Sequence, residues 1–209
     1  MAEPAQGLFL VLEGPDGSGK TTQAKRLAER LETAGRDVVL VREPGGTAVG
    51  ERVRTLLLDP EVGDLDATTE VLLYQAARRR LVVERIRPAL EAGRTVICDR
   101  WHYSTQAYQG AGGGADAAAI RVTTRIATEG LEPRRAILLD VSDGVAARRM
   151  QRPLDRIERR GPEYRRRVAA ELRRLFQGAN PDRFVVVDGS RSEDEVAEAI
   201  WASVRDLVG

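Results

Sequence analysis

Apolar residues gather in five short runs, each of the length of a buried β-strand. The runs cover residues 8–13, 38–42, 95–99, 136–141 and 184–188. Continuous apolar runs, unlike alternating ones, are typical of strands that are covered on both faces of a parallel sheet. Helical patterns lie between the runs, and the alternation of strands with helices predicts right-handed crossovers and a parallel sheet.

Three of the helical segments have a clear end. They cover residues 20–34, 67–92 and 115–129, and a glycine follows each of them, as expected just beyond the last turn of a helix. Pro88 lies inside the second segment, and a kink or an interruption is expected there because proline removes a helical hydrogen bond. The glycines within residues 110–114 predict a flexible stretch.

The chain of 209 residues, with 42% hydrophobic content, is in the size range of one α/β domain with a full core. It contains no internal repeat and no linker long enough to separate two domains. We therefore expect a single domain over residues 1–209, with a five-stranded parallel sheet and helices on both faces, a three-layer α/β fold. Ligands of such folds bind at the carboxyl ends of the strands, where we expect the functional residues.

Charge is balanced over the chain as a whole, because 33 Lys and Arg face 32 Asp and Glu, giving a formal net charge of +1. Nucleic acids and membrane surfaces bind sustained basic surfaces, so neither is an expected partner. The first residues lack the features of a signal peptide, and no apolar stretch approaches the roughly 20 residues that cross a bilayer. Cys98, a single cysteine, cannot form an internal disulfide. These features predict a soluble, cytoplasmic protein.

A glycine-rich segment follows the first predicted strand and opens the first predicted helix. It contains the full Walker A pattern, in which backbone N–H groups and the positive end of the helix dipole converge on phosphate oxygens. Lys20 is expected to reach the β and γ phosphates, and Thr21 to ligate Mg²⁺. A turn of purely structural role is the alternative; strand, motif and helix together favour ATP or GTP binding. The predicted phosphate-binding residues are Gly14, Pro15, Asp16, Gly17, Ser18, Gly19, Lys20, Thr21 and Thr22.

Two charged residues end the third predicted strand, where the sequence reads VICDR. Asp99 and Arg100 then lie at the carboxyl edge of the sheet, where an acid can organise Mg²⁺ and its basic neighbour can bind an acceptor phosphate. A solvated Asp-Arg pair is an equally good interpretation of these two residues alone. The sequence lacks the Asn-Lys-x-Asp motif of GTPases and the Asp-Glu strand end that is usual in motor and transporter ATPases.

Several blocks of the sequence resemble bacterial thymidylate kinases. They are VLEGPDGSGKTTQ (residues 11–23), VREPGGT (41–47), EVLLYQAAR (70–78), DRWHYSTQAYQG (99–110) and PLDRIE (153–158), and they follow one another in family order over nearly the whole chain. The resemblance implies an adenylate-kinase-like P-loop NTPase fold and a homodimer packed through helices. It further implies that the γ-phosphoryl group of ATP is transferred to dTMP with Mg²⁺, in dTTP biosynthesis.

The implied reaction needs no general base, because the attacking oxygen belongs to an anion whose second pKa is about 6. Its barrier is the repulsion between two anions, which positive charge and in-line positioning must lower. The resemblance places Arg100 at the acceptor phosphate, with Arg42 as a further candidate. It places Asp99 at Mg²⁺ and Asp16 near the 3′ hydroxyl group of the acceptor.

The resemblance also assigns residues to the nucleoside of the acceptor. Tyr74, where the family often has Phe, stacks on the thymine, and Arg78 binds the edge of the base. Pro44 belongs to a turn that shapes the pocket and holds a cis proline in the family. The remaining residues are Ser104, Thr105 and Gln109 at the base and Tyr108 against the ribose 2′ carbon. From the residues themselves, His102 is expected to be a solvated loop residue, and Trp101 and Cys98 to be packing residues.

Arginines are concentrated in residues 148–167 of this otherwise near-neutral chain. Residues 165–167 continue a helical pattern and are interpreted as a solvated surface. Residues 148–161 contain Pro153 and Gly161 and are expected to form a mobile lid. The phosphate loop offers no arginine that could neutralise the charge of the transferring phosphoryl group. The resemblance gives this role to arginines of the lid, among which Arg156 matches the family motif best. The predicted catalytic residues are Asp16, Lys20, Arg100, Arg149, Arg152 and Arg156.

Two other functions are compatible with part of the sequence. A kinase of another nucleoside monophosphate or of a deoxynucleoside would keep the phosphate loop, although a deoxynucleoside kinase needs a base and leaves Arg100 without a role. An ATP-bound regulatory switch needs only the phosphate loop and does not account for the blocks on the acceptor side.

Overall fold

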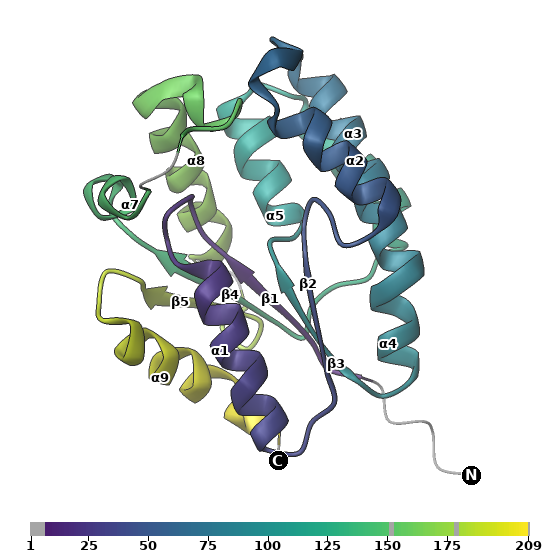
Figure 1. Ribbon diagram of the computed structural model, residues 1–209, viewed down its shortest axis with the longest axis vertical. Helices are drawn as coiled ribbons and strands as arrows, with labels where there is room; N and C mark the ends of the chain where they lie inside the picture. The colour runs from purple at the N-terminus through teal and green to yellow at the C-terminus, as the bar shows by residue number, and fades with distance from the viewer. Residues whose placement is uncertain (1–6, 151–152, 178–179, 209) are drawn as a thin grey trace.

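The computed structural model describes residues 7–150, 153–177 and 180–208 and shows parallel strands surrounded by helices (Figure 1). The strands are β1 (Phe9–Glu13), β2 (Val38–Arg42), β3 (Thr95–Asp99), β4 (Arg135–Asp140) and β5 (Phe184–Asp188). They pair in the order β2-β3-β1-β4-β5, and every pairing is parallel. The predicted α/β class and the five predicted strands are confirmed, with β4 shifted by one residue from its expected bounds.

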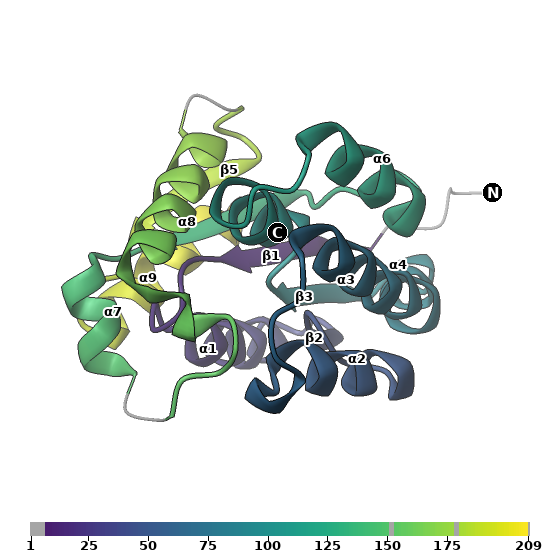
Figure 2. The same ribbon diagram turned by 90° about the horizontal axis from the view of Figure 1, so that it is seen from above.

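Helices cover both faces of this sheet. The longer ones are α1 (Lys20–Thr33), α2 (Ala48–Leu58), α3 (Ala67–Leu81), α6 (Ala117–Thr128), α8 (Gly161–Phe176) and α9 (Glu193–Val204). The shorter ones are α4 (Arg87–Glu91), α5 (His102–Thr105) and α7 (Asp143–Arg149). Figure 2 shows α1 on one side of the strands and α6 on the other. Within the described residues, no helix has the length and apolar character needed to span a membrane.

Side chains of the three central strands, β1, β3 and β4, alternate between two apolar cores. In β1, Phe9 and Val11 belong to the core beneath α3, α4, α5 and α8. Leu10 and Leu12 belong to the opposite core, beneath α1 and α9. Both cores need apolar residues, and this accounts for the continuous apolar runs in the sequence. Cys98 is fully buried, as the sequence predicts.

The helical segment predicted over residues 67–92 is continuous but changes its winding. α3 passes into a π-helical turn, Val82–Ile86, and then into α4, whose first turn contains Pro88. The ring of a proline conflicts with the carbonyl group four residues earlier, which here is that of Glu84. The wider π turn takes up this conflict, so the helix changes type ahead of Pro88 and is not interrupted there.

The glycine-rich residues 110–114 are largely helical, because a π-helix covers Gln106–Gly112. Gly112 is buried, and a Cβ atom at this position would lie 2.6 Å from the ring of Tyr164 on α8. That distance leaves no room for a side chain, so close packing of α8 against the π-helix requires glycine here. The expectation of a flexible stretch is therefore wrong for residues 110–112.

His102 is buried in α5, so the expectation of a solvated loop residue is wrong as well. The side-chain amide of Gln106 donates to its Nδ1 at 3.1 Å, and its Nε2 lies 3.1 Å from Oε1 of Glu132. The chain turns into a helix directly after β3, and this brings the imidazole under the loop that carries Glu132. Trp101 is fully buried, as expected.

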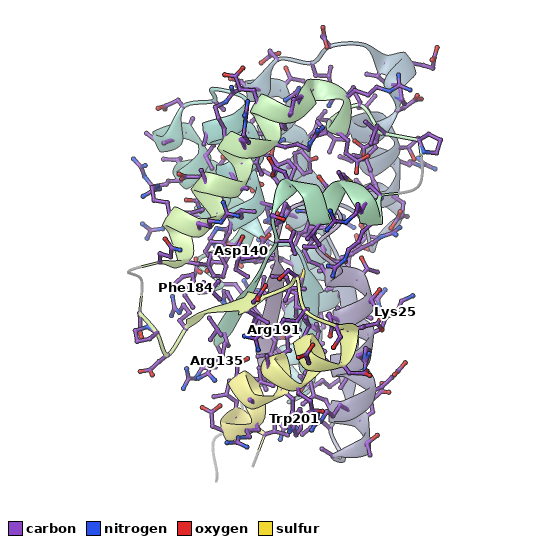
Figure 3. All side chains as sticks on the ribbon, turned by 90° about the vertical axis from the view of Figure 1, so that its left-hand side faces the viewer. Lys25, Arg135, Asp140, Phe184, Arg191 and Trp201 are labelled. Atoms are coloured by element: carbon purple, nitrogen blue, oxygen red, sulfur yellow. The ribbon has the colours of Figure 1, made fainter. Side chains whose placement is uncertain are left out.

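Figure 3 shows the side of the molecule that carries β5, with Asp140 and Trp201 labelled. Each of these two side chains contacts an arginine of a neighbouring helix. Asp140 at the end of β4 accepts hydrogen bonds of 2.9 Å from Arg173 of α8. Trp201 on α9 packs beneath Arg30 of α1, whose guanidinium carbon lies 4.4 Å from the ring centroid. These contacts attach α8 and α9 to their neighbours.

Strand ends that lie level with one another bring the predicted site residues together. Asp99 of β3 pairs with Leu12 of β1 and with Arg42 of β2. The residues that follow these three strands therefore meet at one edge of the sheet, and α3, α5 and α8 rise beyond it (Figure 1).

Candidate active site

The phosphate loop folds around the side chain of its own lysine. Lys20 is buried, and its Nζ donates to the carbonyl oxygen of Pro15 at 2.8 Å and to Oγ of Ser18 at 3.3 Å. Gly17 has a φ of 78°, and a Cβ atom there would lie 2.5 Å from the carbonyl oxygen of Ala146 on α7. The loop thus runs tightly between α1 and α7 (Figure 1). Its remaining predicted residues are Gly14, Asp16 and Gly19, and the first turn of α1 exposes Thr21 and Thr22.

Positive charge at Lys20 is destabilised by its surroundings. Burial and, to a smaller extent, the charge of Arg100 lower the pKa of this amine to about 8. Asp99 and Asp16 raise the pKa in part. An anion bound in the loop acts in the same direction as these carboxylates, so the loop is suited to receive negative charge.

The two predicted metal ligands lie side by side. Thr21, in the first turn of α1, donates from Oγ1 to Oδ2 of Asp99 at the end of β3, at 2.5 Å. Among the described residues there is no cluster of three or more acidic, histidine or cysteine side chains that could hold a metal ion by itself. One hydroxyl and one carboxylate fit Mg²⁺, which takes few protein ligands and completes its shell with waters and substrate phosphates.

Three predicted residues from distant segments meet beside the phosphate loop. Arg100 forms an ion pair with Asp16 and donates to the carbonyl oxygen of Gly14 at 3.0 Å. Tyr108 donates to Oδ2 of Asp16 at 2.9 Å, and the Arg100 guanidinium lies 5.1 Å from the centroid of the Tyr108 ring. Arg100 has a φ of 73°, a left-handed conformation that is uncommon for residues other than glycine. Such backbone outliers often occur at functional sites.

Glu13 holds the segment that follows β3. Its Oε1 accepts hydrogen bonds from the backbone N–H groups of Trp101 at 2.8 Å and Ser104 at 3.1 Å. Its Oε2 accepts one from Oγ of Ser104 at 2.7 Å, and the same hydroxyl accepts from Arg100 at 3.1 Å. Glu13 therefore satisfies N–H groups at the start of α5, which has no side-chain cap of its own. The sequence analysis missed this residue, although a carboxylate at the end of a buried apolar strand always needs such donors.

A pocket opens next to Arg100 and reaches the phosphate loop at Asp16. Its lining includes nine predicted acceptor residues: Asp16, Pro44, Tyr74, Arg78, Arg100, Ser104, Thr105, Tyr108 and Gln109. It also includes residues to which the sequence analysis gave no role in binding, namely Glu43, Arg54, Leu58, Trp101, Asp155 and Ile157. The Glu43–Pro44 peptide bond in this lining is cis.

Arg78 is almost fully buried at the base of this pocket. Its Nε donates to Oε2 of Glu43 at 2.8 Å, its Nη1 to Oε1 of Gln75 at 2.7 Å and its Nη2 to Oγ1 of Thr105 at 3.0 Å. Its guanidinium carbon lies 5.5 Å from the ring centroid of Trp101. Nη2 also lies 2.7 Å from Oε2 of Glu43, so the protein engages Nε and both Nη atoms and leaves at most one of the five N–H groups for a ligand.

Of two neighbouring arginines, Arg54 lines this pocket and Arg42 does not. Arg42 pairs with Glu51 of α2 at 3.0 Å and does not line the pocket, so its role at the acceptor phosphate stays a prediction. Arg54 lines the pocket and donates to the carbonyl oxygen of Pro44 at 3.0 Å. Burial lowers the pKa of Arg54, and the charges of Arg42 and Arg100 add to this. Crowded cations of this kind favour an anion between them. No motif in residues 48–58 marks Arg54.

The predicted lid arginines lie in different surroundings. Arg149, at the end of α7, donates to the carbonyl oxygen of Gly189 at 2.8 Å. Arg156 is buried, donates from Nε to the carbonyl oxygen of Leu57 at 2.8 Å and pairs with Glu70 at 2.7 Å. Arg152 lies outside the described residues. The catalytic role of these three arginines stays a prediction.

The fold and the site together define a class of enzyme. A Walker A loop, an Asp-Arg pair on the neighbouring strand and a separate pocket lined by aromatic, amide and guanidinium groups form the arrangement of a P-loop kinase that acts on a small acceptor.

Comparison with known sequences identifies the family. A sequence model of the family described as "Thymidylate kinase" matches residues 12–200. The thymidylate kinase of Deinococcus radiodurans is 47% identical over 204 residues, which cover 97% of this chain and 98% of that protein. The thymidylate kinase of Enterococcus faecalis is 43% identical, with 95% and 96% covered. That of Pelotomaculum thermopropionicum is 47% identical, with 90% and 88% covered. The chain belongs to the thymidylate kinase family, whose members are nucleoside monophosphate kinases.

Glu43 provides a test of the electrostatics of the pocket. Burial raises the pKa of its carboxyl group from 4.5 to about 7, although Arg78 opposes this shift. Between pH 4.5 and 7 the folded state thus retains a proton that the unfolded chain releases, so this group makes the free energy of unfolding fall as the pH rises. Relative to Glu43→Gln, the wild-type protein is expected to lose roughly 2 to 3 kcal/mol of stability between pH 5 and pH 8. Urea unfolding of both proteins at pH 5 and pH 8 measures their free energies of unfolding. If the difference between the two proteins were the same at both pH values, the raised pKa of Glu43 would be contradicted.

Proposed function

We propose that this protein transfers the γ-phosphoryl group of ATP to dTMP, giving ADP and dTDP, in the biosynthesis of dTTP. Membership of the thymidylate kinase family supports this reaction. The observation that carries the proposal is the position of Arg100. Its guanidinium is bonded to Gly14 and Asp16 of the phosphate loop and also lines the acceptor pocket, so it lies where the two phosphate groups have to meet.

Positive charge is the main contribution that the protein makes to this reaction. Lys20 lies in the phosphate loop, Arg100 at the junction and Arg54 in the acceptor pocket. Among the described residues, neither Lys20 nor Arg54 forms an ion pair with a carboxylate, so both charges remain for phosphate groups. The two anions repel each other, and fixed cations on either side hold them in line without further reorganisation.

Thr21 and Asp99 are the residues that would hold Mg²⁺, Asp99 through a water molecule. When it is bound, Mg²⁺ neutralises charge on the phosphate oxygens of ATP. The hydrogen bond of 2.5 Å between the two side chains supports this assignment, because it places both oxygens at the first turn of α1, next to the loop.

The hydrogen-bonding groups of the pocket suit thymine. Arg78 has one N–H group left to donate, and the Gln109 side chain lines the same pocket. Thymine offers the oxygen at C4 as an acceptor and N3–H as a donor, whereas cytosine offers an amino group and a bare ring nitrogen at the same places. Tyr74 is in position to stack on the base from the neighbouring turn of α3.

The sugar of the acceptor belongs at Asp16 and Tyr108. The hydrogen bond between these two side chains places the carboxylate, proposed at the 3′ hydroxyl group, next to the ring, proposed at the 2′ carbon. The 2′ and 3′ carbons are adjacent in ribose, so the two assignments support each other.

Residues 148–161 are proposed to act as a mobile lid, in which Arg149, Arg152 and Arg156 stabilise the transferring phosphoryl group. Asp155 and Ile157 line the acceptor pocket, which supports a position of this segment over the site.

A homodimer is proposed because α3 and α6 expose apolar side chains. Leu72 of α3 is 55% exposed, and Val122 and Ile126 of α6 are 60% and 68% exposed. The two helices pack against each other, and the Gln75 amide of α3 donates to Thr124 of α6 at 2.7 Å. Apolar patches shared by two neighbouring helices are typical of isologous dimer interfaces.

The proposed reaction also implies a cytoplasmic location, which fractionation of the source cells would test.

An ADP-release assay across dTMP, dUMP, dCMP and UMP tests the reaction. With Mg²⁺ and ATP, dTMP is expected to have the highest kcat/KM, and removal of Mg²⁺ by a chelator is expected to abolish turnover. Arg100→Ala is expected to lower kcat/KM for dTMP by roughly 10²-fold or more, because a charge at the transferring group is lost. A wild-type protein that leaves dTMP unconverted would refute the proposed function.

The lid is tested in the same assay with single arginine variants. Arg156→Ala is expected to lower kcat by roughly 10³-fold while the KM for dTMP changes little. Arg159→Ala is the matched control, because Arg159 is an exposed arginine of the same segment, and within the described residues its side chain bonds only to the carbonyl oxygen of Leu154. Turnover of a folded Arg156→Ala protein equal to that of the control would remove Arg156 from the mechanism.

The dimer is tested by sedimentation velocity. The wild-type protein is expected to sediment as a dimer, and Ile126→Glu as a monomer, because a buried unpaired carboxylate is costly. Val186→Glu is the control, since Val186 is an exposed apolar residue of the edge strand β5. A wild-type protein that is monomeric at micromolar concentration would rule out the α3–α6 interface.

A further inference from the structure

Glu70 is a fully buried carboxylate of α3 that none of the roles described above requires. Its Oε1 lies 2.7 Å from Nη2 of Arg156 and 2.5 Å from Nη2 of Arg160. Its Oε2 accepts a hydrogen bond from Nε2 of Gln109 at 3.1 Å. One buried side chain thus contacts the segment proposed as the lid and also a residue of the acceptor pocket.

The chemistry of this contact decides which way the Gln109 amide faces. A carboxylate paired with two guanidinium groups offers only acceptor oxygens, so the end of the amide that faces Glu70 has to be the nitrogen. The two ends of an amide have nearly the same shape, and only hydrogen-bond partners distinguish them. With the nitrogen held by Glu70, the oxygen of Gln109 is the end that remains for the pocket.

An acceptor at this place selects between pyrimidines. The N3–H group of thymine donates to a carbonyl oxygen, whereas the bare N3 of cytosine faces it as a second acceptor, and two buried acceptors leave each other unsatisfied. A reversed amide would favour cytosine by the same reasoning.

We infer that Glu70 is a specificity-determining positioning residue, which fixes the amide oxygen of Gln109 toward the pocket and so disfavours cytosine nucleotides as acceptors. This inference rests on the proposed function, because it takes the pocket to hold a pyrimidine monophosphate. Arg156 and Arg160 hold the carboxylate in place, and Glu70 lies one turn before Tyr74 on the helix that also carries Arg78.

The test compares dTMP with 5-methyl-dCMP, two acceptors that differ only at the edge of the base in question. The measured quantity is the ratio of their kcat/KM values. In Glu70→Gln the side chain at position 70 can donate as well as accept, so both orientations of the Gln109 amide become possible. The ratio is expected to fall roughly ten-fold or more, the effect of about one buried hydrogen bond.

Two further variants separate the effect of the orientation of the Gln109 amide from the effect of protein stability. The double exchange Glu70→Gln with Gln109→Glu reverses donor and acceptor, because the amide at position 70 now donates to a carboxylate at position 109. The group at position 109 again presents an acceptor oxygen to the pocket, so the ratio is expected to return toward the wild-type value. Arg160→Gln removes one ion pair of Glu70 and leaves its bond to Gln109. This control is expected to keep the wild-type ratio even where its melting temperature falls.

A purely structural role of Glu70 would lower kcat/KM for both acceptors alike and leave the ratio of Glu70→Gln unchanged, which would overturn the inference. If Glu70→Gln does not fold, Glu70→Asp keeps the charge beside the arginines but withdraws it from Gln109, and the same fall in the ratio is expected. If neither single variant folds, the double exchange decides by its ratio, and failure of all three to fold assigns Glu70 to stability and rejects the inference. A wild-type protein inactive on dTMP refutes the proposed function instead.

Discussion

Buried carboxylates around the acceptor pocket are the constraint on which the rest of the site depends. Glu13, Glu43 and Glu70 are each at most 5% exposed, and a carboxylate in such surroundings is stable only when donors or cations surround it. Each of them therefore fixes a partner that the proposed chemistry uses. Glu13 holds Ser104, Glu43 holds Arg78, and Glu70 holds Gln109. Glu13 and Glu70 do not line the pocket and Glu43 does, and each of the three orients a group that lines it.

The buried carboxylates have cations or donors as neighbours, whereas the cations Lys20 and Arg54 have other cations near them. Lys20 and Arg54 have lowered pKa values because burial and neighbouring arginines disfavour their charges. The protein thus places cations close to one another where two phosphate groups are proposed to meet, and among the described residues neither Lys20 nor Arg54 is paired with a carboxylate. Preorganised charge of this kind lowers the barrier of a reaction between two anions, because the protein does not have to rearrange when the anions approach.

Local motifs revealed part of this site, because the position of a motif after a strand can be read from the sequence. The Walker A loop and the pair Asp99 and Arg100 each follow a strand, so the parallel order of the sheet was enough to bring them together. Arg54 and Glu70 gave no such signal. An arginine or a glutamate on an amphipathic helix is usually a solvated residue, and only the packing of α2 and α3 over the strand ends turns these two inward.

The amino-acid sequence by itself determined the strands, the α/β class, the phosphate loop and the family, because apolar periodicity and motif spacing are local properties of the chain. Tertiary structure alone decided which polar groups face one another. It buried His102, which the sequence left in solvent, and it made Gly112 a contact surface for α8 where the glycines suggested a flexible stretch. It also joined Glu70 to Gln109 and to Arg156, residues far apart in the chain. Hydrogen bonds and ion pairs of this kind depend on distances between segments, and no local pattern records those distances.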